Sequence, residues 1–358
     1  MFVPIHSARR FTNCLLKWHL QENDRNMPWK GICDPYKIWL SEIILQQTRV
    51  EQGTNYYNKF ITRFPNIRTL YNAPETEVFK LWEGLGYYSR CRNLLKTAKL
   101  ICEKFNGRFP ETYHELLSLP GIGPYTAAAI ASFAFELPEA VVDGNVFRVL
   151  SRYFSIEEDI DGVNGKKIFK KVAQQLIEYA QPSLFNQALM DLGATICKPA
   201  LAHCAKCPLN RSCKSYKNDR IYEFPFRSKI LKLKNRYFLY LILNRKNETI
   251  ITERLKKDIW QNLWEPICHE VEQNQLNDPA FINQWIQENY QDYMSGIAQT
   301  SEISVQKLSH QKIHARFVQI DLRKFPSKPS GIRVKVSDLK KYPFPKIVLE
   351  HFRENEYI

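Results

Sequence analysis

ELLSLPGIGPYTAAAIA, residues 115–131, predicts two helices joined by a very short turn. Gly121 and Gly123 permit positive φ and leave backbone N–H groups uncovered, and Pro124 suits the first position of a new helix. The N-terminus of that helix favours an anion. The stretch therefore predicts a helix-hairpin-helix that can grip a phosphate of DNA, with a plain pair of antiparallel helices as the alternative.

The chain before about residue 220 is expected to be mainly helical, because apolar residues recur there at spacings of three and four. The clearest expected helices cover residues 36–47, 75–82, 89–104 and 166–179. Eleven of the thirteen glycines lie at or before Gly193, which indicates a different architecture further on.

The last third of the chain is expected to be a smaller α+β domain. Runs rich in β-branched and aromatic residues predict strands, and one stretch predicts a helix. The strands are expected at residues 236–243, 249–254, 303–308 and 313–322, and the helix at 279–290. The expected organisation is a helical domain at 1–220, a basic linker at 221–235 and the α+β domain at 236–358.

Composition favours a soluble protein with a polyanionic partner. The 358 residues include 51 Lys and Arg against 37 Asp and Glu, a net charge of +14. Eleven basic residues and two acids lie between Lys198 and Arg236, a surplus of 11 − 2 = +9 that could follow a DNA backbone. No apolar run of about 18 residues occurs and the N-terminus lacks the pattern of a secretory signal, so we expect a cytoplasmic protein outside membranes.

Four of the nine cysteines lie within 17 residues, as Cys197, Cys204, Cys207 and Cys213. A structural zinc site usually pairs two short knuckles, and only one short knuckle occurs here. A single compact loop with four thiolates favours an iron–sulfur cluster. Zinc and unpaired thiols remain the alternatives.

LPGIGPYTA, VVDGNV and the spacing of the four cysteines together resemble the helix-hairpin-helix DNA glycosylases that carry a [4Fe–4S] cluster. The stretches WLSEIILQQTRV (39–50), LWEGLGYYSRCRNL (81–94) and FNQALMDLGATIC (185–197) are similar to adenine DNA glycosylases of the MutY type. The resemblance covers about residues 10–215. It implies a base excision repair enzyme that removes adenine mispaired with 8-oxoguanine or guanine in double-stranded DNA, acting as a monomer. It identifies no protein partner.

The resemblance implies that Glu42 protonates the adenine and that Asp143 stabilises the sugar cation or its covalent adduct. Glu42 is the only charged residue between Ile38 and Thr48, so apolar surroundings could raise its pKa. Asp143 precedes Gly144 and Asn145, a more polar setting in which we expect an ionised carboxylate. It also suits the N-cap of the following helix. Tyr125 and Asn145 match residues that lie beside this carboxylate in relatives.

Tyr125 occupies the position at which endonuclease III has its Schiff-base lysine. No lysine occurs between Phe109 and Phe147, so we expect a monofunctional glycosylase. A bifunctional glycosylase and lyase is one alternative, and a non-catalytic DNA-binding protein is another.

The resemblance also implies residues that contact DNA. A flipped base leaves a gap that amide and aromatic side chains can fill, and an amide can read the edge of a base. Those expected to wedge into the duplex are Gln46, Gln47 and Tyr87; those expected to line or read the base pocket are Arg25, Trp29 and Gln187.

The C-terminal domain resembles a Nudix hydrolase in NLWEPIC (262–268) and KLSHQKIHARFVQI (307–320). Ser309 and His310 lie in a Leu-Ser-His version of a loop that recognises 8-oxoguanine in relatives, and both can donate hydrogen bonds. A turn without ligand contact is the alternative. Residues 221–295 contain no glycine and no Nudix-type glutamate cluster, so we expect a reading domain without hydrolase activity.

Overall fold

The computed structural model describes residues 2–228, 233–327 and 329–358. Residues 229–232 of the expected linker, with its Lys229 and Lys232, lie outside the described residues. The chain divides into two compact units, one formed by Met1–Asn72 with Arg92–Lys229 and the other by Ala73–Cys91 with Ile230–Ile358. Each unit has its own core.

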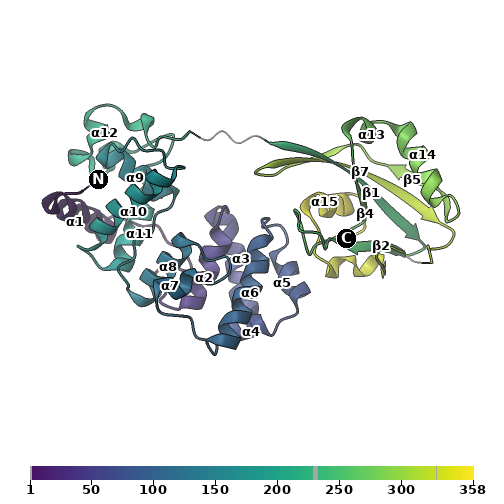
Figure 1. The fold of residues 1–358 in the computed structure, drawn as a ribbon, viewed down its shortest axis with the longest axis horizontal. Coiled ribbons are helices and arrows are strands. Elements are labelled where there is room, and N and C mark those ends of the chain that lie inside the picture. The colour runs from purple at the N-terminus through teal and green to yellow at the C-terminus, as the bar shows by residue number, and fades with distance from the viewer. Residues whose placement is uncertain (1, 229–232, 328) are drawn as a thin grey trace. The chain divides into compact units, whose positions relative to one another are not determined.

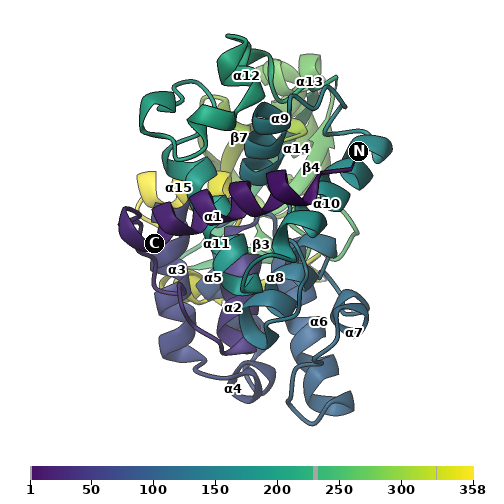
Figure 2. The ribbon, with the colours of Figure 1, turned by 90° about the vertical axis from the view of Figure 1, so that its left-hand side faces the viewer.

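The first unit is helical (Figures 1 and 2). The helices of this unit are α1 (Ile5–Gln21), α2 (Pro35–Leu45), α3 (Val50–Arg63), α4 (Ile67–Tyr71), most of α6 (Ser89–Lys104), α7 (Tyr113–Leu117), α8 (Pro124–Phe135), α9 (Gly144–Phe154), α10 (Val163–Ile177), α11 (Pro182–Thr195) and α12 (Lys214–Lys217). Three short 3₁₀ turns follow α11, at Cys204–Lys206, Asn210–Ser212 and Ile221–Glu223.

Helix α2 is one of the two most enclosed helices of this unit, because eight of its eleven residues are buried, as many as in α9. It packs against α8, where a run of small alanines permits close approach of the two helices. On the other side of the unit, α1 packs against α10 and α11, with Phe11 and Leu15 fully buried (Figure 2). Burial of this kind contributes about 2 kcal/mol for each large apolar side chain.

Helices α9 and α11 approach each other very closely at one glycine. A Cβ atom built on Gly193 would lie 2.6 Å from Cβ of Asn145. Any larger residue at this position would therefore push the start of α9 away from α11. Gly193 thus sets the place of the residues that precede and begin α9.

The predicted hairpin joins α7 and α8. Gly121 has φ of +75°, in the left-handed region that favours glycine, and a Cβ there would lie 2.6 Å from Cβ of Asn93. Gly123 differs from the expectation, since its φ is −88° and it forms the N-cap of α8. Nothing lies within 4 Å of where its Cβ would be, so a ligand can approach the backbone closely there.

The second unit is built on an eight-stranded sheet with the strand order β3-β2-β1-β7-β5. Strand β4 also pairs with β1, β6 with β7, and β8 with β2. Its strands are β1 (Lys234–Arg245), β2 (Glu248–Glu253), β3 (Trp264–Glu265), β4 (Ile267–Val271), β5 (Met294–Thr300), β6 (Ser304–Lys307), β7 (Gln311–Leu322) and β8 (Ile332–Lys335).

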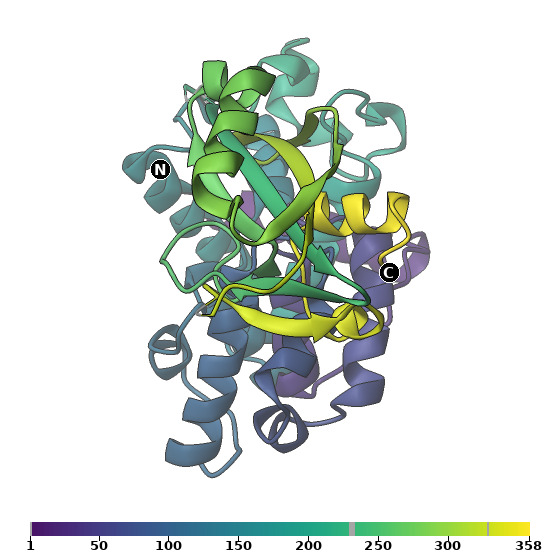
Figure 3. The same cartoon turned by 90° about the vertical axis from the view of Figure 1, so that its right-hand side faces the viewer.

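Helices cover both faces of this sheet (Figure 3). Helices α13 (Gln273–Asn277) and α14 (Pro279–Tyr290) pack their apolar residues against Leu239, Leu241 and Leu243 of β1. Helix α15 (Lys346–Glu354) lies against the opposite face, where the His351 ring stacks on Phe317 at 3.9 Å. The result is the α+β arrangement expected for this part of the chain.

Segment 73–91, which the sequence places in the helical part, groups with the second unit. It contains α5 (Glu75–Trp82). The Lys80 ammonium donates to the carbonyl of Tyr342 at 3.0 Å, and the backbone N–H of Phe344 donates to Glu83 at 2.9 Å. These bonds tie the segment to the chain just before α15.

Most predicted elements agree with the observed ones to within three residues. Helices α5, α6 and α14 coincide with their predicted ranges, whereas α2 ends two residues early and α10 lies about three residues upstream of its predicted range. Strands β3, β4, β5 and β8 were not predicted, and neither were α13 and α15. Helices α1, α3, α4, α11 and α12 lie in the part expected to be helical but were not predicted individually. Within the described residues, no helix is long and apolar enough to span a membrane.

Candidate active site

A pocket of about 500 Å³ opens in the helical unit. Its walls come from the segment after α1, from α2, α8 and α11, and from the start of α9. Seven of the predicted site residues line it: Arg25, Trp29, Glu42, Tyr125, Asp143, Asn145 and Gln187. Segments up to about 160 residues apart thus meet around one cavity large enough for a nucleobase.

Glu42 lies on α2 and is only 7% exposed. Its pKa is raised to about 7, chiefly by burial; a hydrogen bond with the Tyr125 hydroxyl lowers the pKa and the nearby Asp143 carboxylate raises it. The rise in pKa expected from the apolar sequence is therefore confirmed. A carboxyl group with this pKa carries its proton in a substantial fraction of molecules at neutral pH.

Asp143 forms the N-cap of α9, accepting a bond from the Val146 N–H at 2.8 Å and from the Asn145 amide at 2.7 Å. The polar setting expected from the sequence is present, but the residue is also partly buried. Burial raises its pKa above the ordinary value, while these hydrogen bonds and the Arg148 charge lower it. The N-cap role and a role in the pocket are therefore compatible.

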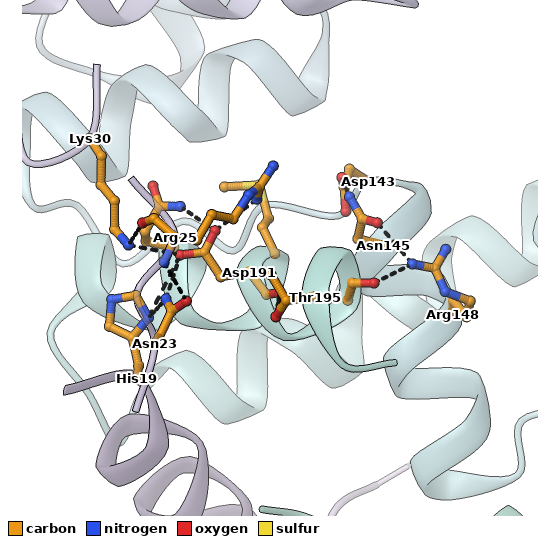
Figure 4. Close-up of polar contacts among 12 residues, drawn as sticks. His19, Asn23, Arg25, Lys30, Asp143, Asn145, Arg148, Asp191 and Thr195 are labelled. Atoms are coloured by element: carbon orange, nitrogen blue, oxygen red, sulfur yellow. Dashed lines mark hydrogen bonds and ion pairs between the residues drawn. The ribbon is translucent and has the colours of Figure 1, made fainter. Parts of the chain in front are cut away.

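Arg148, which does not line the pocket, is hydrogen-bonded to Asn145 (Figure 4). Its guanidinium donates to Asn145 Oδ1 at 2.9 Å and to the carbonyls of Gly193 and Cys197 at 2.6 and 2.7 Å. A fork of five donors suits such a set of acceptors. Asn145 can therefore offer its amide N–H to Asp143 in a fixed orientation.

A second polar group surrounds Asp191 on α11, whose side chain is fully buried (Figure 4). Its carboxylate is ion-paired with Arg25 at 2.8 Å and with Lys30 at 3.1 Å. Lys30 also donates to the carbonyl of Arg25. Sequence reasoning missed Asp191 and Lys30; the one available signal was that Asp191 follows Gln187 by four residues, one helical turn.

Trp29 is 8% exposed, and its ring meets Tyr57 edge-on at 5.2 Å. It is therefore both a core residue and part of the pocket wall. Lys30 places an amine in the pocket, outside the stretch 109–147 that contains no lysine. Because that amine is held in an ion pair with Asp191, it is a cation rather than a free nucleophile.

The predicted wedge residues of the helical unit lie at the end of α2. The Gln46 amide donates to the Thr126 hydroxyl at 3.4 Å, and Gln47 is exposed. Gln47 has φ of +56°, an unfavourable backbone conformation for a residue with a Cβ. Neither residue lines the pocket. Non-glycine residues with such backbones cluster at functional sites.

The predicted residues of the second unit lie together. Tyr87 has φ of +49° and its hydroxyl is hydrogen-bonded to the Ser309 hydroxyl. The Arg90 guanidinium lies 5.6 Å from the Tyr87 ring. Ser309 and His310 are exposed in the turn between β6 and β7. An aromatic ring and two hydrogen-bonding side chains therefore share one exposed part of this unit.

Cys197, Cys204, Cys207 and Cys213 line a second, smaller cavity. Val149, Leu192, Leu209 and Ile221 contribute apolar walls, and the Arg152 guanidinium lies 3.5 Å from the sulfur of Cys197. This donor set fits a thiolate-bound cluster, because apolar walls exclude water and the cation offsets thiolate charge. In the described parts of the chain, no three His, Cys, Asp or Glu side chains are close enough to hold a single metal ion.

Comparisons with known proteins place both units in known families. Residues 40–178 match the HhH-GPD superfamily of base excision DNA repair proteins, and residues 238–353 match the NUDIX domain. The structure of a thermostable thymine-DNA glycosylase is 29% identical with a TM-score of 0.55, covering 60% of this chain and 100% of that chain. The helical unit and its pocket thus define a helix-hairpin-helix base excision repair protein.

The similarity to curated proteins is more specific. The adenine DNA glycosylase of Buchnera aphidicola subsp. Baizongia pistaciae is 41% identical over 286 residues, which are 78% of this chain and 77% of the relative. The human adenine DNA glycosylase is 40% identical over 224 residues, which are 60% of this chain and 41% of the human protein. The chain belongs to the adenine DNA glycosylase family.

Proposed function

We propose that this protein excises adenine opposite 8-oxoguanine or guanine in double-stranded DNA, as a monofunctional and monomeric glycosylase. The observation that carries the proposal is a pair of carboxyl groups in one pocket of base size. Glu42 has a pKa of about 7, and Asp143 is held by an N-cap and an amide. Two carboxyl groups in different environments suit the acid and the charge-stabilising roles of glycoside cleavage.

In the proposed reaction, Glu42 gives its proton to the adenine while the bond between the sugar carbon and the base nitrogen breaks. The bonding electrons leave with the base, and the sugar becomes an oxocarbenium ion. Asp143 stabilises that cation electrostatically or by forming a transient covalent bond. Water then adds to the sugar and loses a proton to the Glu42 carboxylate, which restores the acid. Tyr125 is hydrogen-bonded to Glu42, and the Asn145 amide donates to Asp143. Each carboxyl group thus has its own polar partner, which suits its separate role.

The surroundings of the pocket support a DNA substrate. The backbone at Gly123 is open at the N-terminus of α8, which suits a phosphate. Gln46, Gln47 and Tyr87 are proposed to fill the space left by the flipped base, and Ser309 and His310 to contact the 8-oxoguanine. A [4Fe–4S] cluster held by the four cysteines would stabilise the basic loop around it, without taking part in the bond cleavage.

The proposal of a monofunctional enzyme rests on Tyr125 and on the engagement of Lys30. A lyase needs an amine that attacks the sugar, and the hairpin offers a phenol instead. Lys30 lines the pocket, but its ammonium is shared between Asp191 and the Arg25 carbonyl.

A single-turnover assay tests the proposed function directly. Duplexes with adenine opposite 8-oxoguanine, guanine or cytosine are incubated with the protein and analysed with and without hot alkali. We expect strand breaks only after alkali, with the fastest release opposite 8-oxoguanine. Breaks without alkali would support a bifunctional enzyme. DNA binding with no base release from any duplex would support a non-catalytic protein.

The Glu42→Gln variant separates binding from chemistry. Glutamine keeps the size of the side chain but cannot act as an acid, so we expect unchanged duplex affinity and a loss of base release of about 10²- to 10⁴-fold. Unchanged release by this variant would remove Glu42 from the mechanism.

A further inference from the structure

The Asp191 carboxylate uses all of its hydrogen-bonding capacity. One oxygen accepts bonds from Arg25 at 2.8 Å and from the Gln187 amide nitrogen at 3.0 Å. The other accepts bonds from the Asn23 amide at 2.8 Å and from Lys30 at 3.1 Å. An ionised carboxylate has about four such positions, and all four partners are donors.

Two of these partners, Arg25 and Lys30, are cations, so Asp191 is an ion-paired carboxylate that only accepts hydrogen bonds. The amide of Gln187 can therefore face Asp191 only with its N–H group. A flipped amide would place two acceptor oxygens in contact inside the protein, which is costly. The choice between the two ends of the Gln187 amide thus follows from the chemistry of Asp191.

This orientation leaves the Gln187 carbonyl oxygen as the atom available to the pocket. Gln187 lines the pocket and is partly exposed to it. In the parts of the chain that the structure describes, its carbonyl oxygen has no hydrogen-bond partner. The pocket therefore presents a fixed acceptor to the edge of a base.

We propose that Asp191 is a positioning residue that selects 6-aminopurines, by fixing the Gln187 carbonyl toward the pocket. The inference rests on the proposed function. An exocyclic amine on the purine donates to this carbonyl, whereas the oxygen of a 6-oxopurine would face it as a second acceptor. A purine without a substituent at this position leaves the carbonyl unpaired.

Single-turnover base release is measured for adenine, hypoxanthine and unsubstituted purine, each opposite 8-oxoguanine. The three bases leave the sugar with different intrinsic ease, so each variant is judged by its ratio of rates relative to the same ratio in the wild-type protein. Division by the wild-type ratio cancels the intrinsic difference. The ratio reports selection of the base, which a general loss of stability or of acid catalysis would not change.

Three variants test the proposal, and a fourth is the control. Gln187→Met removes both ends of the amide and keeps the length of the side chain. Asp191→Asn can donate to Gln187 and so permits the flipped amide, whereas Asp191→Glu remains an acceptor only. The control is Thr195→Val, because Thr195 donates to the backbone carbonyl of Asp191 and not to its carboxylate (Figure 4).

We expect Gln187→Met and Asp191→Asn to lower the preference for adenine over hypoxanthine about tenfold or more. Asp191→Glu and Thr195→Val should keep the wild-type preference, whatever their overall rates. A wild-type preference in Gln187→Met, or in Asp191→Asn, would overturn the proposal, as would a lost preference in Asp191→Glu.

Thermal unfolding shows which variants fold. If Asp191→Asn does not fold, Gln187→Met and Asp191→Glu decide the question, since the proposal requires them to differ. Failure of the proposed function has another signature, namely that the wild-type protein releases no adenine from any duplex.

Discussion

Replacing the buried acid Glu42 by glutamine should change how the stability of the protein depends on pH. The carboxyl group has a pKa of about 7 in the folded protein against 4.5 as its ordinary value. Below pH 4.5 it is protonated in both the folded and the unfolded state and carries no penalty. As the pH rises from 4.5 to 7 the unfolded chain loses this proton first, so the folded state loses stability.

Above pH 7 the folded protein holds a buried charge, and the penalty is complete. The difference between the two pKa values corresponds to about 3 kcal/mol at 1.36 kcal/mol for each pH unit. The Glu42→Gln variant does not have this penalty. Its free energy of unfolding minus that of the wild-type protein should therefore rise by about 2 to 3 kcal/mol between pH 5 and pH 8.5.

Urea unfolding followed by tryptophan fluorescence at these two pH values measures this difference. Glu111→Gln, the same chemical change at an exposed residue of the helical unit, is the matched control and should change by only a few tenths of a kcal/mol. If Glu42→Gln and the control show the same pH dependence, the reasoning about the buried acid is wrong. The rate of base release by the wild-type protein should also fall about tenfold for each pH unit above 7.

Other substitutions test separate parts of the structure. Gly121→Ala should lower stability by about 1 to 3 kcal/mol because of its left-handed backbone and close neighbour, whereas Gly123→Ala should fold normally but weaken DNA binding, as measured by unfolding and by titration with duplex. Arg148→Met should cost about 3 kcal/mol or more in urea unfolding, because the buried bond to the Gly193 carbonyl and the partly buried bond to the Cys197 carbonyl lose their donor. Cys213→Ser should lower the iron content of the purified protein, measured by metal analysis. Arg236→Met should destabilise the second unit by about 2 kcal/mol or more in thermal unfolding, because Asp258 and Glu270 lose their shared cation.

Local sequence was sufficient to predict the helical character of the first 220 residues, several individual helices and the raised pKa of Glu42. The periodicity of a helix and the absence of charge around Glu42 are properties of short stretches, and they survive in the folded protein. The same holds for Gly121, whose turn needs positive φ. Gly123 shows the limit, since glycine permits an unusual backbone without requiring it, and here it serves as an open N-cap.

Contacts between distant segments could not be predicted in this way. Asp191 is hydrogen-bonded to Asn23, Arg25 and Lys30, each more than 160 residues away in the sequence. No local spacing pattern indicates these contacts. The grouping of residues 73–91 with the C-terminal unit has the same origin, because it depends on bonds to the chain near Tyr342 and Phe344. A short strand such as β3, which has two residues, is too short to show the alternation of apolar and polar residues that predicts a strand.

The left-handed backbone at Gln47 has a consequence for engineering this protein. A side chain with a Cβ holds that conformation at a cost of about 1 kcal/mol, which glycine would not incur. A screen that rewards heat resistance alone would therefore favour glycine at this position and discard the amide. Selection for thermal stability thus favours glycine at position 47, whereas selection for a side chain at the end of α2 favours glutamine.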